Sequence, residues 1–241
     1  MEKGKQCLRL DKFIVAVGAG SRSQAKTMVK AKRLTVNGQV AKKSDLAVNE
    51  QEDQICLDGE VLVYSEFDYL MLNKPAGVIS ATEDPQERTV LDLLPARYHR
   101  VAPVGRLDKD TVGLLLLTND GHLNHNLLSP KKHVDKCYEV TLAAPCQPDY
   151  KEKMQAGVVL EDGYVCLPAR IDWQDDIPHI AYLTIQEGKF HQVKRMFAAL
   201  GNQVTHLKRI RMGSLVLDEH LAAGEFRQLT EEEVRQLKGK R

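Results

Sequence analysis

Residues 104–120 read VGRLDKDTVGLLLLTND, a charged turn followed by a run of leucines. The four leucines at 114–117 are bounded by glycines and turn residues, which predicts a short strand buried on both faces of a sheet. Asp108 and Asp110 lie in the turn that leads into this strand. Loops anchored on such a scaffold often carry chemistry, whereas an isolated carboxylate beside a strand more often forms a turn or a surface ion pair.

The net charge of +1 hides a strong asymmetry along the chain. Residues 1–43 contain 11 Lys and Arg against 2 Asp and Glu, a net charge of +9, and residues 44–241 contain 23 against 31, a net charge of −8. A basic N-terminal block on a mildly acidic body is typical of a module that docks on phosphate groups. The sequence therefore predicts a nucleic-acid partner.

Composition predicts a folded protein of the reducing cytoplasm. A hydrophobic content of 43% in 241 residues is sufficient for a packed core, in one large domain or two unequal ones. The five cysteines are widely scattered and form no C-x-x-C pair, which favours free thiols over disulfides or a zinc site. The N-terminus is polar and no apolar run is long enough to span a bilayer. We expect a cytoplasmic monomer without a membrane segment.

The basic block has the pattern of two short helices followed by a hairpin. Apolar residues recur at helical spacing over 10–17, Ser21 and Gln24 form a capping box for a second helix, and Asn37-Gly38 predicts a type I′ turn. Exposed lysines usually form a solvated face, but a near absence of acidic residues favours contact with RNA. The candidate RNA-binding cations are Arg9, Lys12, Arg22, Lys26, Lys30, Lys32 and Arg33.

Beyond residue 60 the chain predicts a larger α+β domain. Strands outnumber helices and the connections are short, which favours a mixed sheet. A pair of short apolar runs, 158–160 and 164–167, flanks Glu161-Asp162-Gly163 and predicts a hairpin. We expect strands over 69–74, 136–142, 180–185, 204–212 and 214–217, and helices over 122–128, 149–156 and 191–200.

The order Gly-Arg-Leu-Asp-x-Asp-Thr-x-Gly-Leu-Leu-Leu-Leu-Thr resembles the active-site motif of the pseudouridine synthases, in the branch that modifies ribosomal RNA and carries an N-terminal S4 domain. Residues 7–57 resemble the S4 RNA-binding module, and Lys74-Pro-Ala-Gly resembles a recurrent motif of these synthases. The resemblance implies a small S4-like RNA-binding domain over residues 1–60, followed by a mixed-sheet pseudouridine synthase catalytic domain over residues 61–241.

The activity that this resemblance implies is an isomerisation of uridine. The bond from ribose C1′ to N1 breaks, the base turns, and a bond forms from C1′ to C5, without redox change, so we expect neither a cofactor nor a metal. A carboxylate near the sugar must either attack C1′ or take a ribose proton. Asp108 matches the catalytic aspartate of the family. The target base must leave its stack, because the reacting atoms are not accessible within a helix.

A cation must lie beside this carboxylate, because burial alone would favour its protonated form. The resemblance places that cation in the segment EGKFHQVKRM, residues 187–196, where Lys194 matches a basic residue that pairs with the aspartate. Lys194 and Arg195 point about 100° apart on a helix, so only one of them can face the site. Lys194 is the first candidate and Arg195 the second.

Three further residues match family positions. Tyr138 matches the active-site tyrosine, whose ring can stack on uracil and whose hydroxyl can remove the C5 proton, although a tyrosine on a strand is more often part of a core. Arg106 matches the arginine beside the aspartate, which holds a phosphate or fills the gap left by the extruded base. Ile185 matches an apolar residue that packs against the base. His191 is expected to make a structural hydrogen bond.

Residues 129–133 and 191–196 look more similar to the small-subunit enzyme than to its large-subunit relatives. We therefore expect a 16S ribosomal RNA pseudouridine synthase that acts on one uridine, in free RNA or in the assembling small subunit. The alternatives are a 23S ribosomal RNA pseudouridine synthase, a non-catalytic S4-type RNA-binding or ribosome-assembly factor, and a hydrolase that uses the same carboxylate to release uracil.

Overall fold

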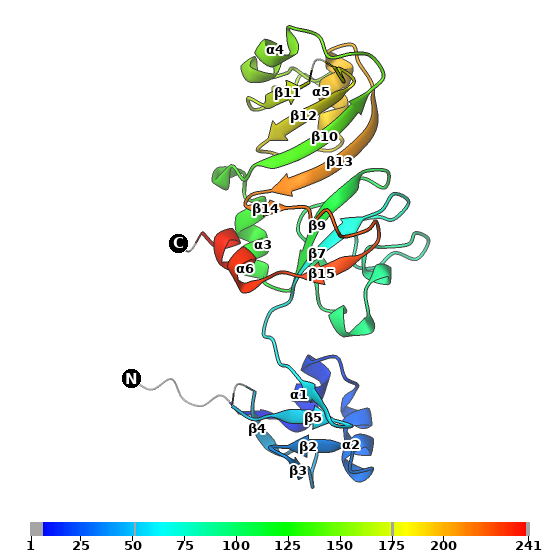
Figure 1. Cartoon of the computed structure of the whole chain (residues 1–241), viewed down its shortest axis with the longest axis vertical. Coiled ribbons are helices and arrows are strands. Elements are labelled where there is room, and N and C mark those ends of the chain that lie inside the picture. The colour runs from blue at the N-terminus through cyan, green and yellow to red at the C-terminus, as the bar shows by residue number, and fades with distance from the viewer. Residues whose placement is uncertain (1–6, 51, 175, 240–241) are drawn as a thin grey trace. The chain divides into compact units, whose positions relative to one another are not determined.

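The chain forms two compact units in the computed structural model (Figure 1). The first contains the chain up to Phe67 together with Pro95–Arg100, and the second contains the rest. The first unit extends past the boundary expected near residue 60, because Glu60–Leu62 forms its last strand. The described residues are 7–50, 52–174 and 176–239, so the polar segment 1–6 lies outside them.

Two helices and short strands surround one apolar core in the first unit. The hydroxyl of Ser21 accepts a hydrogen bond from the Gln24 amide, and the Gln24 side chain accepts one from the Ser21 amide, as the sequence predicts. Asn37 and Gly38 have φ of 52° and 77°, which is the backbone that the predicted type I′ turn requires. The elements are β1 (Cys7–Arg9), α1 (Leu10–Ala16), α2 (Arg22–Lys30), β2 (Leu34–Val36), β3 (Gln39–Val40), β4 (Ala47–Asn49), β5 (Ile55–Leu57), β6 (Glu60–Leu62) and the 3₁₀ turn η2 (Ala96–Tyr98).

A single mixed sheet organises the second unit, in the order β11-β12-β10-β13-β9-β7-β15, with β8 and β14 beside it. Every pairing in it is antiparallel except that between β9 and β13. The predicted α+β class is confirmed. The strands are β7 (Tyr69–Lys74), β8 (Ala102–Pro103), β9 (Val112–Thr118), β10 (Lys136–Leu142), β11 (Arg170–Trp173), β12 (Ile180–Ile185), β13 (Val204–Met212), β14 (Leu215–Val216) and β15 (Phe226–Gln228).

Helices pack on this sheet, and Figure 1 shows α3 and α6 side by side near β14. Thr230 and Glu233 form a capping box that begins α6. No helix among the described residues has the length and apolarity needed to cross a bilayer. The helices are α3 (Gly121–Leu128), α4 (Tyr150–Ala156), α5 (Gln192–Ala199) and α6 (Glu231–Leu237), with 3₁₀ turns η1 (Leu91–Leu93) and η3 (Pro130–Lys132).

Strand β9 is the buried strand that the leucine run predicts. All four leucines from Leu114 to Leu117 are fully buried. Leu114 and Leu116 belong to a core that also contains Leu123 of α3 and Leu237 of α6. Successive side chains of a strand point to opposite faces, so Leu115 and Leu117 are buried on the other side. Each buried leucine stabilises the fold by about 2 kcal/mol.

The two halves of the sheet meet where β9 pairs with β13. Only two residue pairs form this parallel ladder, Lys208 with Val112 and Arg209 with Gly113. Gly113 has φ of 98°, and a Cβ atom there would overlap the carbonyl oxygen of Arg209. The guanidinium of the buried Arg209 donates to the Leu114 carbonyl across the same junction, at 2.8 Å. The junction therefore requires a glycine at this position.

The structure differs from the predictions mainly at short strands. The hairpin expected at residues 158–167 is present in a minimal form: Val159 and Val165 form an antiparallel bridge, the Leu160 amide donates to the Tyr164 carbonyl at 2.8 Å, and the Cys166 amide donates to the Val158 carbonyl at 2.9 Å. Strands β8, β11 and β15 contain two to four residues, which is too short for a pattern of alternation to identify them.

Gly113→Ala should destabilise the protein by about 3 kcal/mol or more, because the added methyl group meets backbone and the residue must keep a positive φ. Urea denaturation of the purified variant measures this change. Gly121→Ala is the matched control, since Gly121 begins α3 with open space around its Cα and alanine favours helices. Equal stability of the two variants would contradict the proposed role of Gly113.

Candidate active site

A buried lysine shapes the turn that carries Asp108. Lys74, at the end of β7, is fully buried, and its ammonium group donates to the carbonyl oxygens of Thr111 at 2.8 Å, Asp108 at 3.0 Å and Pro75 at 3.1 Å. The carbonyl of Lys109 lies at 3.4 Å. Burial lowers the pKa of Lys74 to about 8, against the opposite effect of two nearby carboxylates. The ammonium group of Lys74, protonated at neutral pH, thus binds several backbone carbonyls of the turn at once and fixes its conformation.

Two carboxylates of this turn share one cation. The ammonium of Lys194, from the first turns of α5, lies 3.0 Å from Oδ2 of Asp108 and 2.7 Å from Oδ1 of Asp110. Burial lowers the pKa of Lys194, but its hydrogen bonds to Asp110 and Asp108 outweigh that effect and raise it. The same hydrogen bond lowers the pKa of Asp110. The two carboxylates differ in exposure, with 27% of the Asp108 side chain accessible against 73% of Asp110.

A third group approaches Asp108 from the start of α5. Nε2 of His191 lies 3.7 Å from Oδ1 of Asp108, whereas Lys194 bonds Oδ2. His191 has φ of 49°, in the left-handed region that residues other than glycine seldom occupy. Strained backbone of this kind is concentrated at functional sites. The sequence motif contains His191, but its contact with the carboxylate depends on this local turn.

Asp108 lies at the edge of a pocket with an apolar wall. Tyr138 from β10 and Ile185 from the end of β12 line this pocket together with Asp108, and both are buried. Leu207 of β13 completes the wall. Tyr138 and Ile185 are brought together because β10 and β12 are adjacent antiparallel strands. The arrangement places an apolar wall next to the carboxylate of Asp108.

A hydrogen-bond network behind the pocket holds the loop before α5. Glu187 accepts hydrogen bonds from the Tyr164 hydroxyl and from the Gln192 side-chain amide, both at 2.6 Å, and from the Leu167 amide at 2.9 Å. The side chain of Gln192 in turn accepts from the Lys189 amide at 2.8 Å. The bond to Glu187 raises the pKa of Tyr164 to about 12. These hydrogen bonds therefore fix the loop at both of its ends.

The remaining sequence candidates divide into two groups. Arg106 lines the same pocket and is exposed to solvent, a position from which it can reach a phosphate. Arg195, the second candidate for the cation beside Asp108, forms an ion pair with Asp162 at 2.6 Å instead. The 100° angle between neighbouring helical side chains separates Lys194 from Arg195 in the way that the sequence predicts.

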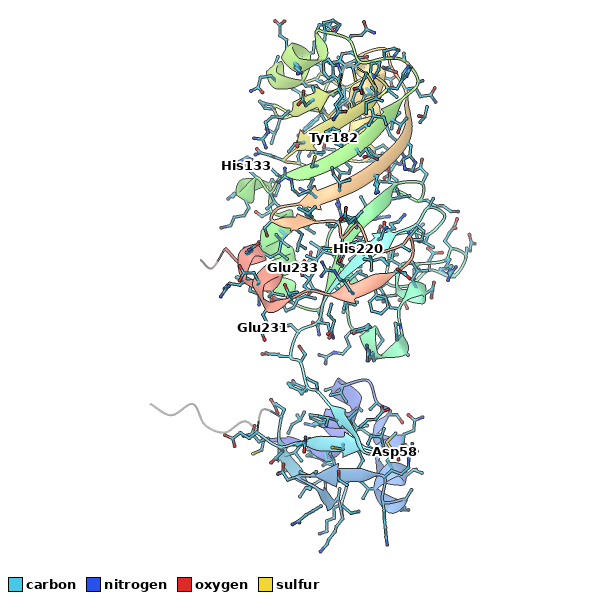
Figure 2. The ribbon with its side chains drawn as sticks, viewed as in Figure 1. Asp58, His133, Tyr182, His220, Glu231 and Glu233 are labelled. Atoms are coloured by element: carbon cyan, nitrogen blue, oxygen red, sulfur yellow. The ribbon has the colours of Figure 1, made fainter. Side chains whose placement is uncertain are left out.

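Cations of the first unit lie on its surface, and two of them are engaged within it. Arg9 donates to Asp11 at 2.7 Å, and Arg33 donates to both carboxylate oxygens of Asp58, which lies at the β5–β6 turn (Figure 2). Among the seven candidate cations, the exposed ones without such a pair among the described contacts are Lys12, Arg22, Lys26, Lys30 and Lys32.

Comparison with known proteins identifies both units. A model of the RNA pseudouridylate synthase family matches residues 68–199, and a model of the S4 domain matches residues 8–55. The chain belongs to the RNA pseudouridylate synthase family. The resemblance inferred from the sequence motifs is thereby confirmed, and the synthase is an isomerase.

Relatives of the synthase match it over almost their whole length. An uncharacterized RNA pseudouridine synthase of Bacillus subtilis, YtzG, is 49% identical over 94% of this chain and 97% of its own. Ribosomal small subunit pseudouridine synthase A of Escherichia coli is 41% identical over 94% and 98%. A crystal structure of a pseudouridylate synthase is 39% identical, covers 95% of this chain and 99% of its own, and has a TM-score of 0.68.

Sequence reasoning missed the groups that position Asp108 in the synthase. The motif Lys74-Pro-Ala-Gly indicated a turn, but its lysine bonds backbone carbonyls about 35 positions away, which no local pattern reveals. The sharing of Lys194 by Asp110 was not expected, although Asp110 lies two residues from Asp108.

Lys74→Met should lower the free energy of unfolding by about 1–3 kcal/mol, because it leaves buried carbonyls without donors. The substitution should also remove one contribution to the pH dependence of the free energy of unfolding. The folded protein releases the Lys74 proton near pH 8 and the unfolded chain near 10.5, so the unfolded chain binds more protons between these values. Lys74 thus makes stability rise with pH there, by at most about 1.4 kcal/mol per unit.

Urea denaturation of both proteins from pH 7.5 to 9.5 tests this expectation. The stability difference between wild type and variant should increase over this interval, while groups common to both proteins cancel. Lys109→Met is the control, because Lys109 is exposed and pairs only with Glu87 among the described side chains. A constant difference between wild type and Lys74→Met would refute the lowered pKa.

Proposed function

We propose that this synthase converts one uridine of small-subunit (16S) ribosomal RNA to pseudouridine, with Asp108 as the catalytic carboxylate. The observation that carries the proposal is the ion pair between Asp108 and Lys194, at 3.0 Å, beside a pocket walled by Tyr138 and Ile185. The choice of the small subunit rests on relatives that bear that name and match along nearly the whole chain.

Lys194 holds the Asp108 carboxylate in place through the 3.0 Å ion pair in this proposal. A carboxylate oxygen of Asp108 then acts at the ribose, either by attack on C1′ or by removal of a ribose proton. The C1′–N1 bond breaks, the base turns in the pocket, and C1′ bonds to C5. The proton on C5 is lost and N1 gains one, so the product is an isomer of the substrate.

The pocket walls suit the displaced base. The ring of Tyr138 offers an aromatic face for stacking, and its hydroxyl can accept the C5 proton. Ile185 packs against the base beside Tyr138 in this proposal. Arg106, exposed at the rim, holds a phosphate of the extruded nucleotide. Each of these groups comes from the second unit of one chain, which supports a monomer as the active form.

Asp108→Asn should abolish the release of tritium from 5-tritiated uridine in transcribed 16S ribosomal RNA, because an amide neither attacks C1′ nor takes a proton. The variant should keep its thermal stability and its affinity for RNA. Asp110→Asn is the matched control: it also contacts Lys194 but is largely exposed, and its activity should fall less than about tenfold.

The same assay separates the alternative functions. Tritium release from a 23S transcript but not from a 16S transcript would move the proposal to the large subunit. Free uracil in the supernatant would indicate a hydrolase, which an isomerase must not produce. Equal tritium release by wild type and Asp108→Asn would refute the catalytic role of Asp108.

The first unit is proposed to attach the enzyme to its RNA through surface cations. Lys12, Arg22 and the three lysines of the second helix region carry the main contacts, with Arg9 and Arg33 contributing less because Asp11 and Asp58 already bind their guanidinium groups. The second unit is mildly acidic, so it depends on this basic unit for long-range attraction to a polyanion. An RNA substrate and five free thiols are both consistent with action in the cytoplasm.

Replacing Lys26, Lys30 and Lys32 together by glutamine should weaken RNA binding and flatten its salt dependence, by about one unit of slope for each phosphate that is no longer neutralised. Filter binding of a 16S transcript at several salt concentrations measures both effects. The control replaces Lys151 and Lys153, which are exposed lysines paired with Asp172 and Asp149. An unchanged slope in the triple variant would remove the proposed role of these lysines.

A further inference from the structure

One aromatic ring stands exposed beside the active site. Phe190, in the loop between β12 and α5, is 76% exposed, and it is the only aromatic residue among the exposed large hydrophobic residues of the described chain. Its ring stacks on that of His191, with centroids 3.7 Å apart and an interplanar angle of 19°. One face of the Phe190 ring is thus covered by imidazole, and the high exposure leaves the other side open to solvent.

The loop holds this stack in a defined orientation. Its two ends are joined by the hydrogen bonds from the Lys189 amide to Gln192 and from Gln192 to Glu187. The carbonyl of His191 accepts from the Arg195 amide at 2.9 Å, which fixes the left-handed backbone at His191 to the first turn of α5. The ring is therefore presented by an ordered loop that holds His191 in a strained backbone conformation.

The stack leads outward from the reacting carboxylate. His191 lines both hollows that meet at Asp108, and its Nε2 lies 3.7 Å from the Asp108 carboxylate. Phe190 is the next ring after His191. Two lysines lie close to the stack in the sequence, Lys189 just before it and Lys194 three residues after it. The ammonium of Lys189 lies over the Tyr164 ring, 4.8 Å from its centroid. An aromatic face next to cations suits a nucleobase attached to a phosphate chain.

We propose that Phe190 is a stacking platform for a nucleobase adjacent to the target uridine. This inference rests on the proposed function and adds a contact that sets how the RNA enters the site. Extrusion of a uridine leaves its neighbours without their stacking partner, and an aromatic ring can take that place. A docked protein is the weaker alternative, because one ring offers far less area than a stable protein interface buries.

Phe190→Ala should raise the KM for 16S transcript roughly 5- to 150-fold, which is the factor that corresponds to the loss of about 1–3 kcal/mol of base stacking. The rate at saturating RNA should change little, because Phe190 does not touch the reacting atoms. Phe190→Trp should restore the KM, whereas Phe190→Leu should not, since leucine keeps apolar volume but lacks a ring face. Tritium release with 5-tritiated transcript measures all four proteins.

Val216→Ala is the control for the loss of an exposed apolar side chain, because Val216 is 60% exposed and lies on β14, away from both hollows. Its KM should equal that of wild type. A wild-type KM in Phe190→Ala, or equal rescue by leucine and tryptophan, would overturn the stacking platform while the proposed function stands. Absence of tritium release by wild type with either ribosomal RNA would instead overturn the proposed function.

Discussion

The parallel contact between β9 and β13 is the constraint on which the geometry of the site depends. It joins two antiparallel half-sheets through two residue pairs, and the missing side chain of Gly113 allows the backbones to approach. Asp108 comes from one half, just before β9, while Tyr138 comes from β10 of the other half and Lys194 from α5, which connects β12 and β13 of that half. A wider junction would separate the carboxylate from its cation.

Charge at the site is balanced at several levels. Lys74 neutralises a cluster of carbonyl dipoles beneath the turn, and its three N–H groups suit convergent acceptors better than a planar guanidinium would. Lys194 faces two carboxylates, so one cation is shared between two acidic groups, and in the proposed complex the phosphates of the RNA would add further negative charge. Exposed Arg106 and Lys189 at the pocket and the basic segment 1–43 would offset that repulsion in the proposed complex.

Local features of the fold were predictable because they depend on neighbouring residues. The capping boxes at Ser21 and Thr230, the Asn37-Gly38 turn and the buried leucine strand each arise within a few positions. The small hairpin at residues 158–167 was predictable in the same way, but its hydrogen bonds to Glu187, about 20 positions along the chain, were not.

By itself the sequence determined the family and the charge asymmetry along the chain, and its motifs led to the carboxylate and the cation that we propose, because all of these depend on residue types at fixed positions. Only the tertiary structure decided that Asp110 shares Lys194, that Lys74 holds the turn, and that the Phe190–His191 stack borders Asp108. The first two contacts join residues about 35 to 84 positions apart, and the third depends on a left-handed turn. Their geometry follows from strand order and backbone dihedral angles, which no local pattern of residue types specifies.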